Sequence, residues 1–361
     1  MKEWLVDLLR CPRTQGRLFI KSVLDTQGDE ILAAILASRD DPDCEYPVIR
    51  GVPDLTLSGR GHEKEQSLIS FGEEWKSFDT WGWLEQLPNE PQAQWRYLGG
   101  LLEYSSNAFQ TKTLSRPEDC AAGKLVLDAG CGNGRFSNQA QLRGARVVAM
   151  DASEAAYVAF ENFHSRGIDS VGVVRGDALN MPFANDRFDY AFSIGVMQHT
   201  GEAEVFLEEL SRVTAPGAAF SVNCYGKGLP SYEFVDAAIR QLTTRLPRRG
   251  VLAFARGLAV ADRFLRSGGD VRERFRRALY RYVNLLPTTI HMYDWYAPKL
   301  AEHYAPEQLK AWLATLQVEL LSAQPPFHEP GYDDLARCRQ HAAFQFLART
   351  PTVTNRQVRN K

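Results

Sequence analysis

Five short apolar runs between residues 124 and 225 alternate with amphipathic stretches, and this alternation limits the fold more than any other feature of the chain. The runs are KLVLDAG, ARVVAMD, VGVVRGD, FDYAFSIGV and AAFSVNCY. The stretch SEAAYVAFENFHSRG, between the second and third runs, has the apolar spacing of a helix. Strands that alternate with helices form a parallel sheet, because parallel neighbours need a crossover connection. The sequence therefore predicts an α/β domain with helices on both faces of a mostly parallel sheet.

With 361 residues, the chain is long enough for this domain and further modules, and composition divides it into four zones. The predicted zones are residues 1–60, a small β-rich module; residues 61–120, an aromatic-rich helical cover; residues 121–225 and 301–350, the core domain; and residues 226–300, an arginine-rich helical insertion. The aromatic residues of the cover are Phe71, Trp75, Phe78, Trp81, Trp83, Trp95 and Tyr97. After the insertion, PEQLKAWLATL predicts a last helix, and QVELLSA and AAFQFLART predict two last strands.

The charge and the cysteines of the chain limit the classes of protein to which it could belong. The net charge of -2 argues against a whole-surface affinity for nucleic acid, although a local basic face stays open. No run is long and apolar enough for a membrane span or has the pattern of a signal peptide, which predicts a soluble, cytoplasmic protein. The six cysteines have no framework spacing and form no CxxC pair, so free thiols are favoured over disulfides.

Three glycines in five residues follow the first apolar run, in the segment VLDAGCGNGRFS. Gly130, Gly132 and Gly134 would lie in the turn between a strand that ends near Asp128 and a helix that begins at Arg135. Without a Cβ atom, the chain turns with positive φ and lets a ligand approach the backbone. Nucleotide and dinucleotide sites share this pattern, and a purely structural tight turn is an alternative.

Acidic residues at three consecutive strand ends narrow the choice of ligand. Asp151 ends the second run, 19 residues beyond Gly132, where its carboxylate would accept hydrogen bonds from ribose hydroxyls. Asp177 follows the third run and would accept from an adenine amine, and Asp128 would pair with a cationic group beside the loop. A ligand that has an amine, a ribose and an adenine fits these acids, and S-adenosylmethionine has all three.

Four ordered segments carry a resemblance: VLDAGCGNGRFS, VVAMDAS, GDALNMPFANDRFDYAFSIGVMQHT and ELSRVTAPGAAF. Together they resemble the motifs of class I S-adenosylmethionine-dependent methyltransferases, of the broad type that includes the ubiquinone and menaquinone enzymes. The resemblance implies a Rossmann-like sheet of seven strands, one of them antiparallel, and S-adenosyl-L-methionine as the cofactor. It implies these binding residues: Asp128, Ala129, Gly130, Cys131 and Gly132 at the methionine moiety, Asp151 at the ribose, Asp177 and Ala178 at the adenine, Ile194 at the cofactor amine, and Ala152 as a further cofactor contact.

The N-terminal zone carries a second resemblance. LLRCPRTQGRL followed by CEYPVIRGVPDL resembles the small zinc-ribbon-like activator module of certain tRNA and protein methyltransferases. Thr14 replaces the second cysteine of the CPxC pair, so that Cys11 and Cys44 alone would face a site for tetrahedral zinc, which needs a larger set of ligands. We therefore predict no metal site and interpret the module as a degenerate ribbon that packs on the enzyme or mediates formation of a homodimer. SFGEEWKSF resembles the element that follows this module in bacterial fused methyltransferases, and its aromatic residues would cover the cofactor.

Two residues are candidates for a general base, which an alcohol acceptor needs. His199 follows the fourth strand, at the carboxyl edge of the sheet where such folds bind substrates, and imidazole titrates near neutrality. Asp294, in HMYDWYAP, is the second candidate. Tyr293, Trp295 and Tyr296 beside it are candidate substrate contacts. The alternatives are a histidine that caps a helix and an aromatic segment that forms the packed root of the insertion.

The insertion contains twelve arginines between Arg240 and Arg281, against three acids. A basic amphipathic helix indicates a membrane-surface or partner-binding element, a lid that grips an anionic acceptor, or simply a solvated face.

The leading hypothesis for the function is O-methylation of a hydroxyl group on a small molecule, either a sugar or a specialised metabolite. The acceptor could be anionic or linked to a lipid. One alternative is a methyltransferase that acts on RNA or a translation factor, although the charge of the chain disfavours nucleic acid as a partner. The other alternative is a catalytically silent subunit that binds the cofactor.

Overall fold

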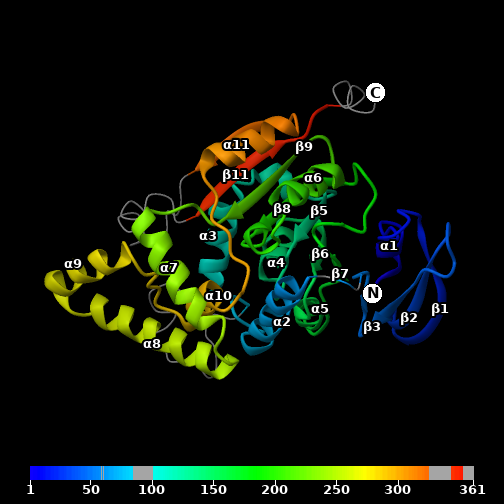
Figure 1. Ribbon diagram of the computed structural model, residues 1–361. Coiled ribbons are helices and arrows are strands. Elements are labelled where there is room, and N and C mark those ends of the chain that lie inside the picture. Colours follow the sequence, from blue (N-terminus) through cyan, green and yellow to red (C-terminus); the bar gives the residue numbers. More distant parts are fainter. Residues whose placement is uncertain (58, 60, 84–100, 325–342, 353–361) are drawn as a thin grey trace.

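A seven-stranded sheet forms the centre of the molecule (Figure 1). The computed structural model describes residues 1–57, 59, 61–83, 101–324 and 343–352. Its strand order is β10-β11-β9-β8-β5-β6-β7, with bounds β5 (Leu125–Ala129), β6 (Arg146–Asp151), β7 (Val171–Arg175), β8 (Phe188–Ile194), β9 (Thr214–Cys224), β10 (Glu319–Gln324) and β11 (Phe344–Arg349). Strands β5 to β9 pair in parallel, and β11 pairs antiparallel with both β9 and β10. The predicted mostly parallel sheet with one antiparallel strand is confirmed.

Helices cover both faces of this sheet. Successive side chains of a strand point to opposite faces, and in the buried strands both sets of side chains are apolar, so both faces need a cover. Val126 faces the hydrophobic cluster that includes α3 (Leu101–Thr113), α4 (Arg135–Gln141) and α5 (Ala155–His164). The next residue, Leu127, faces the cluster that includes α6 (Ala203–Val213) and α11 (Pro306–Thr315). The predicted last helix and the two predicted last strands therefore lie where the sequence patterns placed them.

The N-terminal zone forms a separate antiparallel sheet that docks beside β7. It comprises α1 (Glu3–Val6), β1 (Leu18–Gln27), β2 (Glu30–Ser38), β3 (Glu45–Ile49) and β4 (Val52–Pro53), in the order β1-β2-β3-β4. Arg175, at the end of β7, donates to the Asp54 carboxylate at 2.8 Å, and its carbonyl accepts from the Leu55 amide. The module thus shares a core with the large sheet.

The cysteines of this module have protein partners. Cys11 Sγ lies 3.1 Å from the Tyr46 hydroxyl, and Cys44 Sγ donates to Asp41 at 3.3 Å. Within the described ranges, no group of three or more His, Cys, Asp or Glu side chains could hold a metal ion. The resemblance to a zinc ribbon and the role in dimer formation stay predictions. The five described cysteines are free and buried, and Cys338 lies outside the described residues.

The second zone begins with α2 (His62–Ser77), which packs against α5 and against α10 (Thr289–Tyr296) (Figure 1). Lys76 at its end pairs with Glu154, at the start of α5. The short helix η3 (Pro117–Cys120) leads into β5. Trp95 and Tyr97, two of the aromatic residues predicted for this cover, lie outside the described residues.

The insertion after β9 is helical, as predicted. Its elements are α7 (Pro230–Thr243), α8 (Arg248–Arg266), α9 (Gly269–Tyr280) and α10 (Thr289–Tyr296), on the left of Figure 1. Helix α8 packs against α9 on one side and against α10 on another. In the part of the chain that the structure describes, no helix has the length and apolar character to cross a bilayer.

Candidate active site

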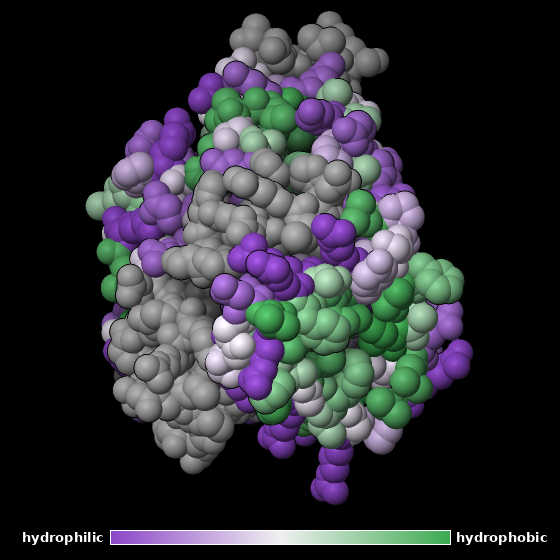
Figure 2. All heavy atoms as spheres, turned by 90° about the vertical axis from the view of Figure 1, so that its left-hand side faces the viewer, coloured by the Kyte–Doolittle hydropathy of each residue, from purple (hydrophilic) through white to green (hydrophobic). Residues whose placement is uncertain are grey.

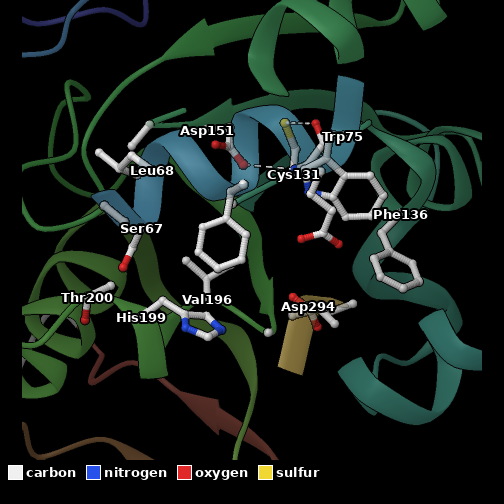
Figure 3. A pocket seen from close by; sticks show the side chains of 18 of the residues that line it. Ser67, Leu68, Trp75, Cys131, Phe136, Asp151, Val196, His199, Thr200 and Asp294 are labelled. Carbon is white, nitrogen blue, oxygen red and sulfur yellow. Dashed lines mark hydrogen bonds between the residues drawn. The ribbon is translucent and has the colours of Figure 1, made fainter. Parts of the chain in front are cut away.

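One cavity lies at the carboxyl ends of β5, β6 and β8 (Figure 3). Its wall includes the glycine loop after β5, the segment after β8 that contains η4 (Met197–His199), one face of α2, and three residues of α10. Parallel sheets bind ligands at this edge because the loops that follow the strands converge there. The cavity therefore brings together four segments that are far apart in the sequence.

The glycine loop has the backbone that the sequence predicted. Gly130, Gly132 and Gly134 have φ values of 92°, 54° and 85°. The amides of Gly130 and Cys131 donate to the Met150 carbonyl of β6, at 2.7 and 2.9 Å. A Cβ atom on Gly130 would lie 2.1 Å from Val196 Cγ2. The loop needs glycine here both for its left-handed φ and because Val196 occupies the space of a side chain.

Asp151 anchors the far side of this loop. One carboxylate oxygen accepts from the Gly132 amide at 3.0 Å, and the other accepts from the amide and hydroxyl of Ser153 at 2.8 and 2.7 Å. Burial raises the pKa of Asp151, and the Ser153 and Gly132 hydrogen bonds oppose that rise. Asp151 and Ala152 both line the cavity, at the end of β6.

Asp128 and Ala129 lie at the end of β5, and neither is among the residues that line the cavity. The Ser137 hydroxyl donates to Asp128 at 2.6 Å, and the Ser193 hydroxyl donates to the Ala129 carbonyl at 2.7 Å. Burial raises the pKa of Asp128 to about 7. The predicted contact of these two residues with the methionine moiety stays a prediction.

Six further residues predicted to bind the cofactor line the cavity: Asp177 and Ala178, predicted at the adenine, Ile194, predicted at the amine, and Gly130, Cys131 and Gly132, predicted at the methionine moiety. Asp177 already has partners within the protein, since it accepts from the Leu179 amide at 3.0 Å and pairs with Lys64 of α2 at 3.1 Å. Helix α2 thus lines the cavity from its predicted adenine end onward. The roles of these six residues toward a cofactor stay predictions.

Aromatic residues of the second zone close the cavity over the glycine loop. Trp75 of α2 lies so close to the loop that a Cβ atom on Gly132 would come within 2.8 Å of its ring. The Arg135 guanidinium, at the start of α4, lies 4.2 Å from the ring centroids of Trp81 and Phe136. All four side chains line the cavity. That this aromatic segment covers the cofactor stays a prediction.

His199 is buried in the cavity wall between the rings of Phe71 and Tyr225. Its Nδ1 lies 2.6 Å from the Leu300 carbonyl, which only accepts, so Nδ1 carries the proton of the neutral ring. Nε2 is therefore a free acceptor, and it has no hydrogen-bond partner within the described residues. Burial lowers the pKa of His199 to about 3.

A pair of acidic residues, Glu74 and Asp294, lies in the same wall. Tyr225 donates to Asp294 at 3.4 Å, whereas one oxygen of Glu74 is buried without a partner in the described part of the chain. Burial raises the pKa of both carboxyls, that of Asp294 to about 6 and that of Glu74 well above its usual value, and the charge of Asp294 adds to the rise for Glu74. In Figure 3, His199 and Asp294 lie on the side of the cavity away from Asp151.

Sequence reasoning missed Glu74. It lies in SFGEEWKSF beside Glu73, and the two neighbours differ only in which face of α2 they occupy: Glu74 is 2% exposed, and Glu73 is partly exposed and pairs with Arg248. A signal was available, since Phe71, Glu74 and Trp75 share helical spacing and would face the same side.

The three aromatic substrate candidates lie in α10 but are not among the cavity-lining residues. Tyr293, Trp295 and Tyr296 are buried in the hydrophobic cluster at the root of the insertion. Trp295 donates to Asp236 at 2.8 Å and stacks on Tyr225, and the Tyr296 hydroxyl accepts from the Asn284 amide at 3.1 Å. This arrangement agrees with the alternative interpretation, in which the aromatic segment forms the packed root of the insertion. Substrate contact by these residues stays a prediction.

Comparison with known proteins relates the central part of the chain to methyltransferases. Residues 127–222 match the family model described as a methyltransferase domain. A demethylmenaquinone methyltransferase of Thermobifida fusca is 36% identical over 31% of this chain and 48% of its own length. Methyltransferase GfsG of Streptomyces halstedii is 33% identical over 31% of this chain and 41% of its own length. A solved geranyl diphosphate C-methyltransferase of Streptomyces coelicolor A3(2) aligns with a TM-score of 0.45 and 11% identity, over 74% of this chain and 87% of that one.

The sheet, the glycine loop and the matched segment together define a class I methyltransferase domain. S-adenosylmethionine is the cofactor of such domains, and residues of the glycine loop, Asp151 and the aromatic side chains over the loop line the cavity at this edge of the sheet. The chain spans less than half the length of the two curated relatives named above.

Asp151→Ala tests the placement of the cofactor. We expect it to weaken binding of S-adenosylmethionine by roughly 5- to 150-fold, or about 1 to 3 kcal/mol, because a charged hydrogen-bond acceptor is lost. The measurement is calorimetric titration. Ser153→Ala is the matched control, since it removes one donor to Asp151 but leaves the carboxylate, and it is expected to change affinity far less. Equal affinity of Asp151→Ala and the unaltered protein would show that the ribose lies elsewhere.

Proposed function

We propose that the protein transfers the methyl group of S-adenosylmethionine to a hydroxyl group of a small-molecule acceptor bound in the cavity. The observation that carries the proposal is His199 Nε2, a buried acceptor without a partner in the described residues, held in the wall beside Glu74 and Asp294. A hydroxyl in the cavity would donate to this nitrogen. The names of the relatives include O-, N- and C-methyltransferases, so the acceptor atom is argued from the cavity and not from them.

The reaction is an in-line displacement. The acceptor oxygen forms a bond to the methyl carbon while the bond from that carbon to sulfur breaks, and the sulfonium becomes the neutral thioether S-adenosylhomocysteine. The hydroxyl proton passes to His199 Nε2 and from there to solvent after product release. The protein supplies alignment, exclusion of water and a proton acceptor.

A strongly basic residue is not needed for this step. As the methyl group bonds to the oxygen, the hydroxyl gains the character of a protonated ether, which is a very strong acid, so its proton leaves within the same step. A neutral imidazole takes that proton even though burial lowers the pKa of His199 to about 3. The low pKa also keeps Nε2 unprotonated, and so competent as an acceptor, across the neutral range.

An amine acceptor is a second candidate, and the two acidic side chains favour it. The Asp294 carboxylate would pair with an ammonium or amine group in the cavity. Both candidates place the acceptor between His199 and Asp294, and they differ in the atom that is methylated.

The first experiment measures formation of S-adenosylhomocysteine with acceptors that differ in one group. Matched sets of an alcohol, its deoxy analogue and its amine analogue would be compared, on sugar and polycyclic frameworks, with tRNA as a further acceptor. Turnover of alcohols alone is the expected result. Turnover of amines alone would establish the second candidate, turnover of tRNA would overturn both, and cofactor binding without turnover of any acceptor would favour a silent subunit.

The pH profile of kcat/KM tests the acidic pair. We expect kcat/KM to rise with pH through about 6. The proposed reason is that Asp294 accepts a hydrogen bond from the methyl acceptor in its ionised form, and burial raises the pKa of Asp294 to about 6. Asp294→Asn should remove this acid limb. Glu74→Gln is the matched control: burial raises the pKa of Glu74 well above its usual value, and the amide resembles the protonated form that this rise favours. An acid limb that persists in Asp294→Asn would contradict the assignment.

A further inference from the structure

Hydrophobic side chains are exposed on two neighbouring helices of the insertion. On α8, Val260 and Phe264 are 55% and 57% exposed, and on α9, Val271 and Phe275 are 80% and 57% exposed. Figure 2 looks at this side of the molecule, where hydrophobic residues gather over α8 and α9. We call this area, formed by the exposed side chains of residues 248–282, the α8–α9 surface. Single exposed apolar residues are common, but a group on one face indicates a binding surface.

The exposed residues of the two helices form one continuous surface. Val260 and Phe264 are four residues apart, as are Val271 and Phe275, so each pair lies on one side of its helix. The Arg272 guanidinium of α9 lies 4.3 Å from the ring centroid of Phe264 on α8. This contact joins the two helices at the surface, one residue from Val271.

The charge around these apolar side chains is basic. Arg249, Arg256, Arg274 and Arg281 are exposed on or next to the two helices. Two of the three acids between Arg240 and Arg281 form ion pairs: Asp262 pairs with Arg266 and Arg276, and Glu273 pairs with Arg276 and Arg277. The exposed part of the α8–α9 surface therefore carries a local excess of positive charge, although the whole chain has a net charge of -2.

We infer that the α8–α9 surface binds an anionic lipid bilayer. Amphipathic helices that combine exposed aromatic and aliphatic side chains with arginine insert the apolar side chains at the level of the lipid headgroups, while the guanidinium groups pair with lipid phosphates. The surface has both components, interleaved on the same helices. An acidic protein partner would use the charge but would need its own apolar groups opposite residues 260–275.

The position of the surface connects it to the cavity. Helix α8 packs on α10, which contributes Asp294 and His291 to the cavity wall. A bilayer bound at α8 and α9 would lie on the side of the insertion away from the sheet, and an acceptor carried by a lipid would reach the cavity along α10. This last step rests on the proposed function, whereas bilayer binding does not.

Vesicle flotation tests the inference with the full chain and without any acceptor. The protein would be mixed with vesicles of phosphatidylglycerol and phosphatidylcholine in equal parts, and with vesicles of phosphatidylcholine alone. We expect flotation with the anionic vesicles only, and its loss at high salt. The double variant Val271→Ser/Phe275→Ser should reduce the bound fraction at least tenfold, and Arg274→Ser and Arg281→Ser should each weaken binding by roughly fivefold, or about 1 kcal/mol.

The controls are exposed residues outside the surface. Leu24 and Leu142 are 67% and 66% exposed, and Leu24→Ser/Leu142→Ser is expected to bind as the unaltered protein does. Thermal unfolding of every variant shows whether the fold is kept. We expect it to be kept, because the substituted side chains are exposed. Absence of flotation with anionic vesicles, or equal flotation with neutral ones, would overturn the inference. So would sedimentation showing a dimer that Val271→Ser/Phe275→Ser dissociates, because a second copy would then cover the surface.

Discussion

Gly130→Ala is expected to weaken binding of S-adenosylmethionine and S-adenosylhomocysteine by at least about 100-fold, which is about 3 kcal/mol. Two effects add. A residue other than glycine is strained at the φ of 92° found here, and its Cβ atom would lie 2.1 Å from Val196 Cγ2. The loop would have to move, and its amides would leave the positions fixed by the Met150 carbonyl. Calorimetric titration with both ligands measures the loss.

The controls separate strain, steric clash and unfolding. Gly123 has a φ of 82°, but a Cβ atom there would meet nothing within 4 Å, so Gly123→Ala imposes similar strain outside the site. The double variant Gly130→Ala/Val196→Ala removes the clash and keeps the strain, and it should recover part of the affinity. Circular dichroism and thermal unfolding show whether each variant keeps its fold. Undiminished affinity of a folded Gly130→Ala variant would mean that the loop does not form the cofactor site.

The sheet and the glycine loop could be predicted because their signals are local. A strand that is buried on both faces reads as a short apolar run, and a tight turn after it needs glycine whatever the rest of the chain does. The position of Asp151 could be predicted for the same reason, because it ends the strand next to the loop and the end of that strand has a fixed place in the sheet. The number of strands and the single antiparallel strand followed from the resemblance and not from the runs themselves.

The acceptor side of the cavity could not be predicted in the same way. Glu74 comes from a helix more than fifty residues before the loop in the sequence, and its burial arises from the packing of α2 against α5 and α10. In HMYDWYAP, the sequence analysis took Asp294 and the three aromatic residues beside it as one group of candidate site residues. The segment is the helix α10, so His291 and Asp294, three residues apart, share the cavity face, and Trp295 faces Asp236.

His199→Ala is expected to lower kcat by roughly 100- to 10,000-fold, the usual range for loss of a general base, with little change in affinity for S-adenosylmethionine. The reason is that Nε2 faces the cavity on the side away from Asp151, where the acceptor and not the ribose would lie. Single-turnover kinetics with an acceptor found in the screen measures the chemical step. Tyr225→Phe is the matched control, since it keeps the ring beside His199 and removes only the hydroxyl that donates to Asp294.

Imidazole rescue distinguishes proton transfer from a structural role. The His199 side chain fills a buried space between Phe71 and Tyr225, so the alanine variant leaves room for a free imidazole. If Nε2 takes the proton, added imidazole should restore part of kcat, with a pH dependence that follows the pKa of the added base. Unchanged kcat in His199→Ala would remove the base from the mechanism, because the strongly acidic protonated ether would then lose its proton to water. A variant that loses cofactor affinity instead would show that His199 holds the cofactor side of the cavity through its bond to Leu300.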